Sequence, residues 1–341
     1  MSIRPRPLRV ALIAAVATFT LACSGGDQGE LADPDETPAT TTLSAASSTT
    51  TPTTTPTTTP TTTTPPHPAA PNGRVYPSVP GTADAAAARV LEVEQLLHDP
   101  DLDPGDERWA DLAHEQQMLY RIIARDPEWV QAALAGASDE LTPVIASHLA
   151  ARQSIADISH GGEPPVNVPA WEIIEPLPAD ELRSLYEAAE ADTGIGWSFL
   201  AAINLIETGF GRIDGLSTAG AQGPMQFLPT TWEEVSDGDI TDPFDAIPAA
   251  ARYLVRRGGP ADMHGALFGY NNSDAYVAAV THYANLFRDD ERSFLATHGW
   301  EIHYSAAAGD LWLPVGFRVE EPTPVEDYLA DAPWSAPPPV S

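Results

Sequence analysis

The chain has 341 residues, enough for two domains or for one domain with long extensions. Its formal net charge is −31, and no basic stripe follows the first few residues. This argues against a nucleic-acid partner, because binding to phosphates needs clustered Lys and Arg. The acidity is typical of a solvated surface that keeps a protein soluble. The single cysteine, Cys23, excludes an intramolecular disulfide.

Residues 1–22 are typical of a signal peptide. Three arginines precede an uncharged, mostly apolar run that is shorter than the roughly 20 residues of a membrane span. The stretch Thr20-Leu-Ala-Cys23 then resembles a bacterial lipobox, although Leu21 stands one place closer to the cysteine than is usual. The resemblance implies export and lipid attachment at Cys23, which would hold the chain at the outer face of the cytoplasmic membrane. The alternative is cleavage after the alanine and secretion to the cell wall.

Residues 23–78 contain the lipid-attachment cysteine and a Thr/Pro-rich linker that we expect to be disordered. From Thr49 to Pro66 the chain nearly repeats Thr-Thr-Thr-Pro, which cannot bury enough apolar surface to offset its ordering entropy. Residues 79–160 then carry Leu, Ile, Val and Trp at helical spacing and predict a helical segment. Its role stays open: it could pack on the next domain, bind a partner or act as a spacer.

Residues 170–290 also show helical spacing and contain the residues with chemical potential. Within the helix predicted over 197–208, Leu200, Ile203 and Glu207 share one face, which should point into the domain. A carboxyl group held among apolar side chains has a raised pKa, as a general acid near neutral pH requires. The alternative is a glutamate at the end of a helix that turns out to solvent.

Three short motifs include and follow this glutamate. Glu207-Thr-Gly-Phe-Gly211 is followed by Ser217-Thr-Ala-Gly-Ala-Gln-Gly-Pro-Met-Gln-Phe-Leu-Pro229 and later by Phe268-Gly-Tyr-Asn-Asn272. In this order and at this spacing they resemble the lytic transglycosylases of the soluble type, which share a fold with goose-type lysozyme. The resemblance covers about residues 175–290. It implies a mainly α, lysozyme-like catalytic domain, preceded by the helical segment and the disordered linker.

The resemblance also implies roles for single residues. Glu207 corresponds to the single catalytic acid and base of the family, and Tyr270 to the tyrosine that faces it. The residues that would line the substrate groove are Ser217, Met225, Gln226, Tyr270 and Asn271. No metal or cofactor is implied. The chain departs from the usual family residues at Pro224, Gly269 and Asn272-Ser273, positions that affect helix geometry and the sugar-binding rim more than the acid itself.

The implied substrate is the glycan strand of peptidoglycan. In the family, the glutamate protonates the oxygen between MurNAc and GlcNAc and then deprotonates the MurNAc C6 hydroxyl, which attacks C1 and gives 1,6-anhydroMurNAc. A muramidase that hydrolyses the same bond would need a second carboxylate. The candidates for it are Asp214, Asp237, Asp239, Asp242 and Asp245. A third possibility is a wall-binding lipoprotein without turnover. Proteins of wall synthesis or division are further candidate partners.

Residues 291–318 predict a small β-hairpin appended to the helical domain. Its strand-like runs are Trp300-Glu-Ile-His-Tyr304 and Leu311-Trp-Leu-Pro-Val315. Three aromatic side chains of these runs could stack on sugar rings or form the core of the hairpin, and the pattern favours the core: Trp300, Tyr304 and Trp312. Residues 319–341 are acidic and Pro-rich, and we expect them to be disordered.

Overall fold

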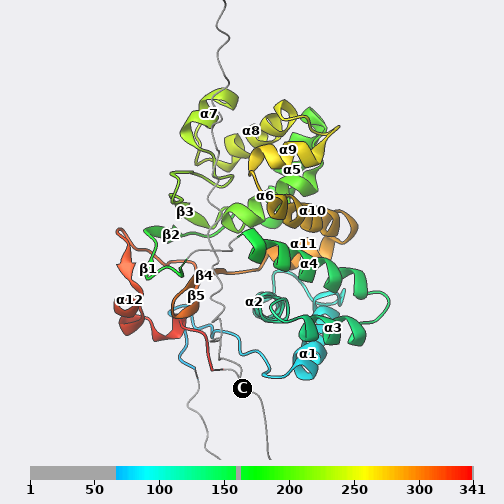
Figure 1. The fold of residues 1–341 in the computed structure, drawn as a ribbon, viewed down its shortest axis with the longest axis vertical. Helices are drawn as coiled ribbons and strands as arrows, with labels where there is room; N and C mark the ends of the chain where they lie inside the picture. Colours follow the sequence, from blue (N-terminus) through cyan, green and yellow to red (C-terminus); the bar gives the residue numbers. More distant parts are fainter. Residues whose placement is uncertain (1–66, 159–162, 340–341) are drawn as a thin grey trace, which may run out of the picture. The chain divides into compact units, whose positions relative to one another are not determined.

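The computed structural model describes residues 67–158 and 163–339. The predicted signal peptide, Cys23 and the Thr/Pro repeat lie outside these residues. The described part is mainly helical, as the sequence predicts (Figure 1). Within it, none of the helices combines the length and the apolar character that crossing a membrane requires.

Four helices precede the domain that contains Glu207. Two of them begin with an aspartate cap, in which a side-chain oxygen accepts a hydrogen bond from the first turn: Asp106 from the Arg108 amide and Asp126 from the Glu128 amide. Their bounds are α1 Ala83–Leu97, α2 Glu107–Ile123, α3 Pro127–Gly136 and α4 Thr142–Ile158.

Seven further helices follow between residues 179 and 298. Gly209 ends α6 in the left-handed conformation with φ 61°, as its place after the predicted helix suggests. Asp242 and Ser273 cap the starts of α8 and α10 through their side chains. The bounds are α5 Ala179–Thr193, α6 Trp197–Thr208, α7 Pro229–Val235, α8 Pro243–Arg256, α9 Met263–Tyr270, α10 Asp274–Asp289 and α11 Glu291–His298.

Helix α10 lies between α4 and α6 and packs against both (Figure 1). One continuous cluster of buried apolar residues joins α1, α2 and α4 to α6, α8 and α10. The sequence left three roles open for the helical segment. In the structure the segment packs on the next domain. This packing brings α2 and α4 to the neighbourhood of α6.

The strands form three antiparallel pairs, β1 with β6, β2 with β3 and β4 with β5. The pair β4–β5 is the predicted hairpin, with Ile302 opposite Leu313 and Ala306 opposite Gly309. It is shorter than the predicted 291–318, because helix α11 occupies the first residues of that range. The bounds are β1 Asn167–Val168, β2 Trp171–Ile173, β3 Ile213–Gly215, β4 Ile302–Ala306, β5 Gly309–Leu313 and β6 Thr323–Pro324.

The chain after the hairpin is ordered as far as residue 339, so the prediction of a disordered tail from residue 319 was wrong. Strand β6 leads into α12 Val325–Asp331, and a short 3₁₀ turn follows at Pro333–Ser335. Val325 is buried in a second apolar cluster with residues of β2, β4 and β5, and the Ser335 hydroxyl donates to the Trp312 carbonyl at 2.7 Å. A few such contacts outweigh the polar composition on which the prediction rested.

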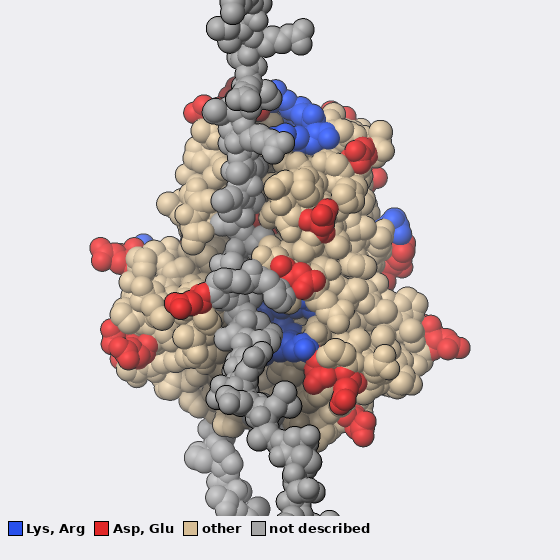
Figure 2. Space-filling view, in the orientation of Figure 1, with Lys and Arg blue, Asp and Glu red and all other residues tan. Residues whose placement is uncertain are grey.

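Acidic side chains are spread over the visible face of the described residues rather than gathered in one patch (Figure 2). This distribution agrees with the interpretation of the net charge as a solvated surface. The hairpin aromatics behave as a core: Trp300 is 5% exposed and Trp312 is fully buried. These two indoles are therefore not available for stacking on sugar rings.

Candidate active site

Glu207 lies in the last turn of α6, one residue before its C-terminal end. Leu200 and Ile203 are fully buried on the same helix, and Glu207 itself is only 2% exposed. The predicted inward face is confirmed, and the alternative of a glutamate turned to solvent is excluded. A carboxyl group is thus placed in apolar surroundings, where its charged form is disfavoured.

The two oxygens of this carboxyl group have different surroundings. Oε1 accepts a hydrogen bond from the Tyr276 hydroxyl at 2.7 Å. Oε2 is buried and has no hydrogen-bond partner among the residues that the structure describes. Burial raises the pKa of Glu207 to about 8, while the bond from Tyr276 acts in the opposite direction. At neutral pH the group is therefore mainly protonated and can donate a proton, as a general acid must.

The loop that carries the Gly-Pro-Met-Gln motif is fastened to α6 at one carbonyl. The Asn204 side-chain amide and the Thr208 hydroxyl both donate to the Pro224 carbonyl, at 2.8 and 2.7 Å. Gly223 has φ +71°, and a Cβ atom there would lie 1.9 Å from the carbonyl oxygen of Ile240. Only glycine fits this approach without displacement of the backbone. The departure from the family at Pro224 keeps the carbonyl that makes the anchor.

Burial and then the charge of Glu207 raise the pKa of Tyr270, so this tyrosine lies near the acid. Its hydroxyl donates to the Met225 carbonyl at 2.7 Å, which ties α9 to the same loop. Its ring is parallel to that of Tyr276, with centroids 6.3 Å apart. The hydroxyl that hydrogen bonds to the carboxyl group belongs to Tyr276. That Tyr270 faces Glu207 during the reaction stays a prediction.

The sequence does not single out Tyr276 as a site residue, because helical spacing places it on the apolar side of its helix. Tyr276 is indeed fully buried, but its hydroxyl ends on Glu207. The signal that could have found it is its place in the first turn of α10, directly after the Ser273 cap that follows Tyr270-Asn271. A buried tyrosine normally has a hydrogen-bond partner for its hydroxyl.

The other predicted groove residues support the loops around the acid. The Gln226 side-chain amide donates to the Gly223 carbonyl at 3.0 Å, and Met225 is fully buried. The Ser217 hydroxyl accepts hydrogen bonds from the amides of Ala219 and Ala221, within its own turn. Asn271 is 7% exposed and ends α9. Among the described residues none of these side chains hydrogen bonds to Glu207.

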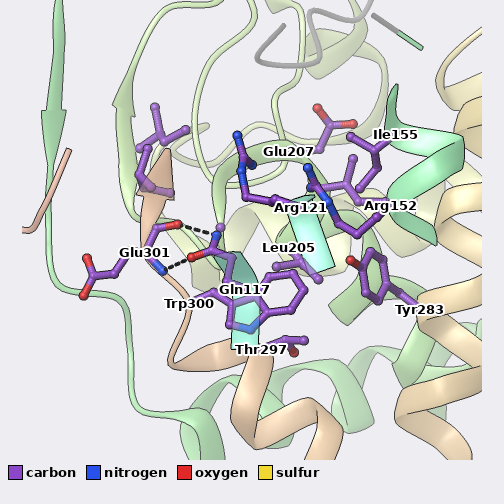
Figure 3. A pocket seen from close by; sticks show the side chains of 14 residues that line it. Gln117, Arg121, Arg152, Ile155, Leu205, Glu207, Tyr283, Thr297, Trp300 and Glu301 are labelled. Carbon is purple, nitrogen blue, oxygen red and sulfur yellow. Dashed lines mark hydrogen bonds between the residues drawn. The ribbon is translucent and has the colours of Figure 1, made fainter. Parts of the chain in front are cut away.

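A cavity of about 60 Å³ lies against Glu207. It is bounded by Leu205 and Glu207 of α6 and Tyr283 of α10, and by residues of the preceding helical segment (Figure 3). That segment supplies Gln117 and Arg121 from α2 and Arg152 and Ile155 from α4. The helices whose role the sequence left open therefore form one wall beside the candidate acid.

Three of the five aspartates considered as a second carboxylate make hydrogen bonds within their own loop or helix cap, among them Asp245, which accepts from the Asp239 amide at 2.8 Å. Asp242 caps α8, and Asp239 accepts from the Thr241 amide and hydroxyl within its loop. None of the five borders this cavity. The second acidic residue there is Glu301, whose carboxylate points away from the other labelled side chains and is bound by Arg74 and by the Trp312 indole at 3.2 Å (Figure 3).

In the described part of the chain, no three His, Cys, Asp or Glu side chains lie close enough together to hold a metal ion. Beside the apolar side chains, the polar groups near Glu207 are Tyr276, Tyr283, Gln117, Arg121 and Arg152.

A helical domain that holds a buried carboxyl group with a raised pKa at the end of a core helix has the features of a general-acid site. Residues 184–291 match the family described as "Transglycosylase SLT domain", a range that contains Glu207 and every predicted groove residue. The match supports a lytic transglycosylase catalytic domain in this part of the chain, and members of this family act on peptidoglycan. No match was found among curated proteins or among solved structures.

Proposed function

We propose that this enzyme cleaves the MurNAc-β-1,4-GlcNAc bond of peptidoglycan and forms 1,6-anhydroMurNAc, with Glu207 as the general acid and then the general base. The observation that carries the proposal is the environment of Glu207: a buried carboxyl group with a pKa of about 8 and with one oxygen, Oε2, that no described residue engages.

The first step needs a proton for the leaving oxygen. Glu207 holds that proton at neutral pH, and Oε2 is the oxygen that no described neighbour occupies. The hydrogen bond from Tyr276 to Oε1 fixes the plane of the carboxyl group. Once the proton has left, the same bond stabilises the carboxylate, because hydrogen bonds to charged acceptors are stronger than those to neutral ones.

The second step needs a base and a nucleophile. The Glu207 carboxylate would take the proton from the MurNAc C6 hydroxyl as its oxygen attacks C1, so the substrate supplies its own nucleophile and no water is consumed. A hydrolase that uses water needs a second carboxylate across the bond. The surroundings of Glu207 support the route with one carboxylate, since Glu301 is bound by Arg74 and Trp312, and the candidate aspartates do not border the cavity.

A comparison of two amide variants tests the catalytic role of the acid. Glu207→Gln keeps the shape and the acceptor for Tyr276 but cannot transfer the proton. Glu233→Gln makes the same change at an exposed position of α7 in the same domain and serves as the control. We expect the release of soluble fragments from purified sacculi to fall at least about 100-fold for Glu207→Gln, the range of general acid–base catalysis. Equal rates for both variants and the unmodified chain would exclude the role.

We also propose that the chain is exported and held at the outer face of the cytoplasmic membrane by lipid on Cys23. The support is the pattern of residues 1–23, with its cationic start, short apolar run and lipobox-like end. Metabolic labelling with a tagged fatty acid tests this proposal. We expect label on the unmodified chain and none on Cys23→Ser, whereas an unlabelled protein in the medium in both cases would indicate simple secretion.

A further inference from the structure

The cavity beside Glu207 contains two guanidinium groups that the proposed reaction does not use. Arg121 and Arg152 line it from α2 and α4, and both are seen among the side chains around the cavity in Figure 3. Burial and then the charge of Arg121 lower the pKa of Arg152 to about 10, so the two groups are near enough to repel each other and Arg152 remains a cation at neutral pH. They stand out in a chain with a net charge of −31.

The negative charges near these groups do not balance them. Asp310 accepts from Arg121 at 3.0 Å and from Arg125 at 2.7 Å, so one carboxylate faces two cations. Burial acts against it, but these two arginines hold the pKa of Asp310 below its ordinary value, and it stays ionised. Of the remaining acids, Glu301 is bound by Arg74, and Glu207 is mainly protonated at neutral pH. The cavity therefore carries an excess of positive charge.

One donor in this cavity has no acceptor. The Nε–H of Arg152 is buried and makes no hydrogen bond to any described residue. A buried donor without a partner is unfavourable, and guanidinium groups match carboxylates in geometry. The volume of about 60 Å³ is several times the roughly 10–15 Å³ that one water molecule needs, so it admits a small polar group. What fits the charge, the donor and the size is a carboxylate that projects from a larger substrate.

We propose that Arg152, with Arg121 beside it, forms a subsite for a carboxylate of the glycan strand next to the bond that Glu207 cleaves. The inference rests on the proposed function, because peptidoglycan is the substrate that would bring a carboxylate there. Two sources share this chemistry: the carboxylates of an attached stem peptide, and the lactyl carboxylate that a MurNAc residue exposes once its stem has been removed.

The test compares Arg152→Gln with Arg108→Gln, a matched loss of charge at an exposed position of α2. Three soluble glycan preparations serve as substrates: strands with their stems, strands stripped by an amidase, and stripped strands whose lactyl carboxylates have been converted to amides. For Arg152→Gln we expect KM to rise about 10- to 100-fold on strands that carry the bound carboxylate, the range expected for a hydrogen bond to a charged group. We expect kcat to change little, partial recovery with Arg152→Lys, and no effect on the amidated strands or with Arg108→Gln.

The pattern over the three substrates identifies the ligand. A rise in KM confined to stripped strands assigns the site to the lactyl carboxylate, a rise confined to stem-bearing strands assigns it to the stem, and a rise on both assigns it to either carboxylate. An unchanged KM on both, or an equal rise on all three preparations, would overturn the proposal. A binding measurement needs no turnover, so it tests the subsite even if the catalytic proposal fails. The same strands are bound to Glu207→Gln and to the double variant that also carries Arg152→Gln, and the affinities are compared.

Discussion

The burial of Glu207 predicts that the variant Glu207→Gln has a larger free energy of unfolding than the unmodified chain, by an amount that depends on pH. The pKa of this carboxyl group is 4.5 in an ordinary environment and about 8 in the fold. Folding thus resists ionisation, and the stability that is fully present below pH 4.5 is lost as the pH rises toward 8. Each pH unit in this window costs 1.36 kcal/mol, which amounts to about 3.4 kcal/mol at pH 7.

Glu207→Gln removes this penalty and keeps the acceptor for Tyr276. Urea unfolding at pH 4, 5.5, 7 and 8 should show nearly equal stability of the variant and the unmodified chain at pH 4 and a growing advantage of the variant above that. The exposed control Glu233→Gln should show no such trend, because its carboxyl group is solvated in both states. A difference between Glu207→Gln and the unmodified chain that stays constant from pH 4 to pH 8 would refute the argument that burial controls this acid.

Three further predictions concern other residues of the core and the site. Tyr276→Phe removes the hydrogen bond that lowers the pKa of Glu207, so the loss of kcat at alkaline pH should move to higher pH; an unmoved limb in the pH–rate profile would contradict this. Gly223→Ala should lower the melting temperature, and it should lower the wall-degrading rate by about tenfold or more, because its Cβ would meet the Ile240 carbonyl. Gly220→Ala should have the smaller effect, because Gly220 has a similar φ of +79° and no atom within 4 Å of the added Cβ. His148 is fully buried between aromatic rings, and burial lowers its pKa to about 3. From pH 6.5 down to 3 the unmodified chain should therefore lose about 1.4 kcal/mol per pH unit more than His148→Phe in urea unfolding, and parallel curves would argue against a buried neutral histidine.

The sequence predicted those features that depend on local chemistry. The ends of α6, α8 and α10 follow from Gly209, Asp242 and Ser273, whose cap geometry is set by neighbouring backbone groups. The inward direction of Glu207 follows from helical periodicity, which places it with Leu200 and Ile203. These inferences need no knowledge of which helices meet.

The features that the sequence did not predict depend on contacts between distant segments. Helical periodicity predicts which side of its helix Tyr276 lies on. It does not predict the hydrogen bond from the Tyr276 hydroxyl to Glu207, which stands 69 positions away in the chain. The sequence does not single out Arg152, because only the packing of α4 on α10 brings it to the cavity. The order of the C-terminal residues likewise depends on distant contacts, because Val325 packs in a cluster with residues of β2, β4 and β5.

The mass of the reaction products tests the central claim most directly. Sacculi digested with the purified protein release muropeptides that mass spectrometry resolves by the loss or gain of one water. If Glu207 acts alone as acid and base, the glycan ends carry 1,6-anhydroMurNAc, which is one water lighter than a reducing end, and Glu207→Gln gives none. Products that carry only reducing-end MurNAc would contradict the account and would indicate hydrolysis with a second catalytic group.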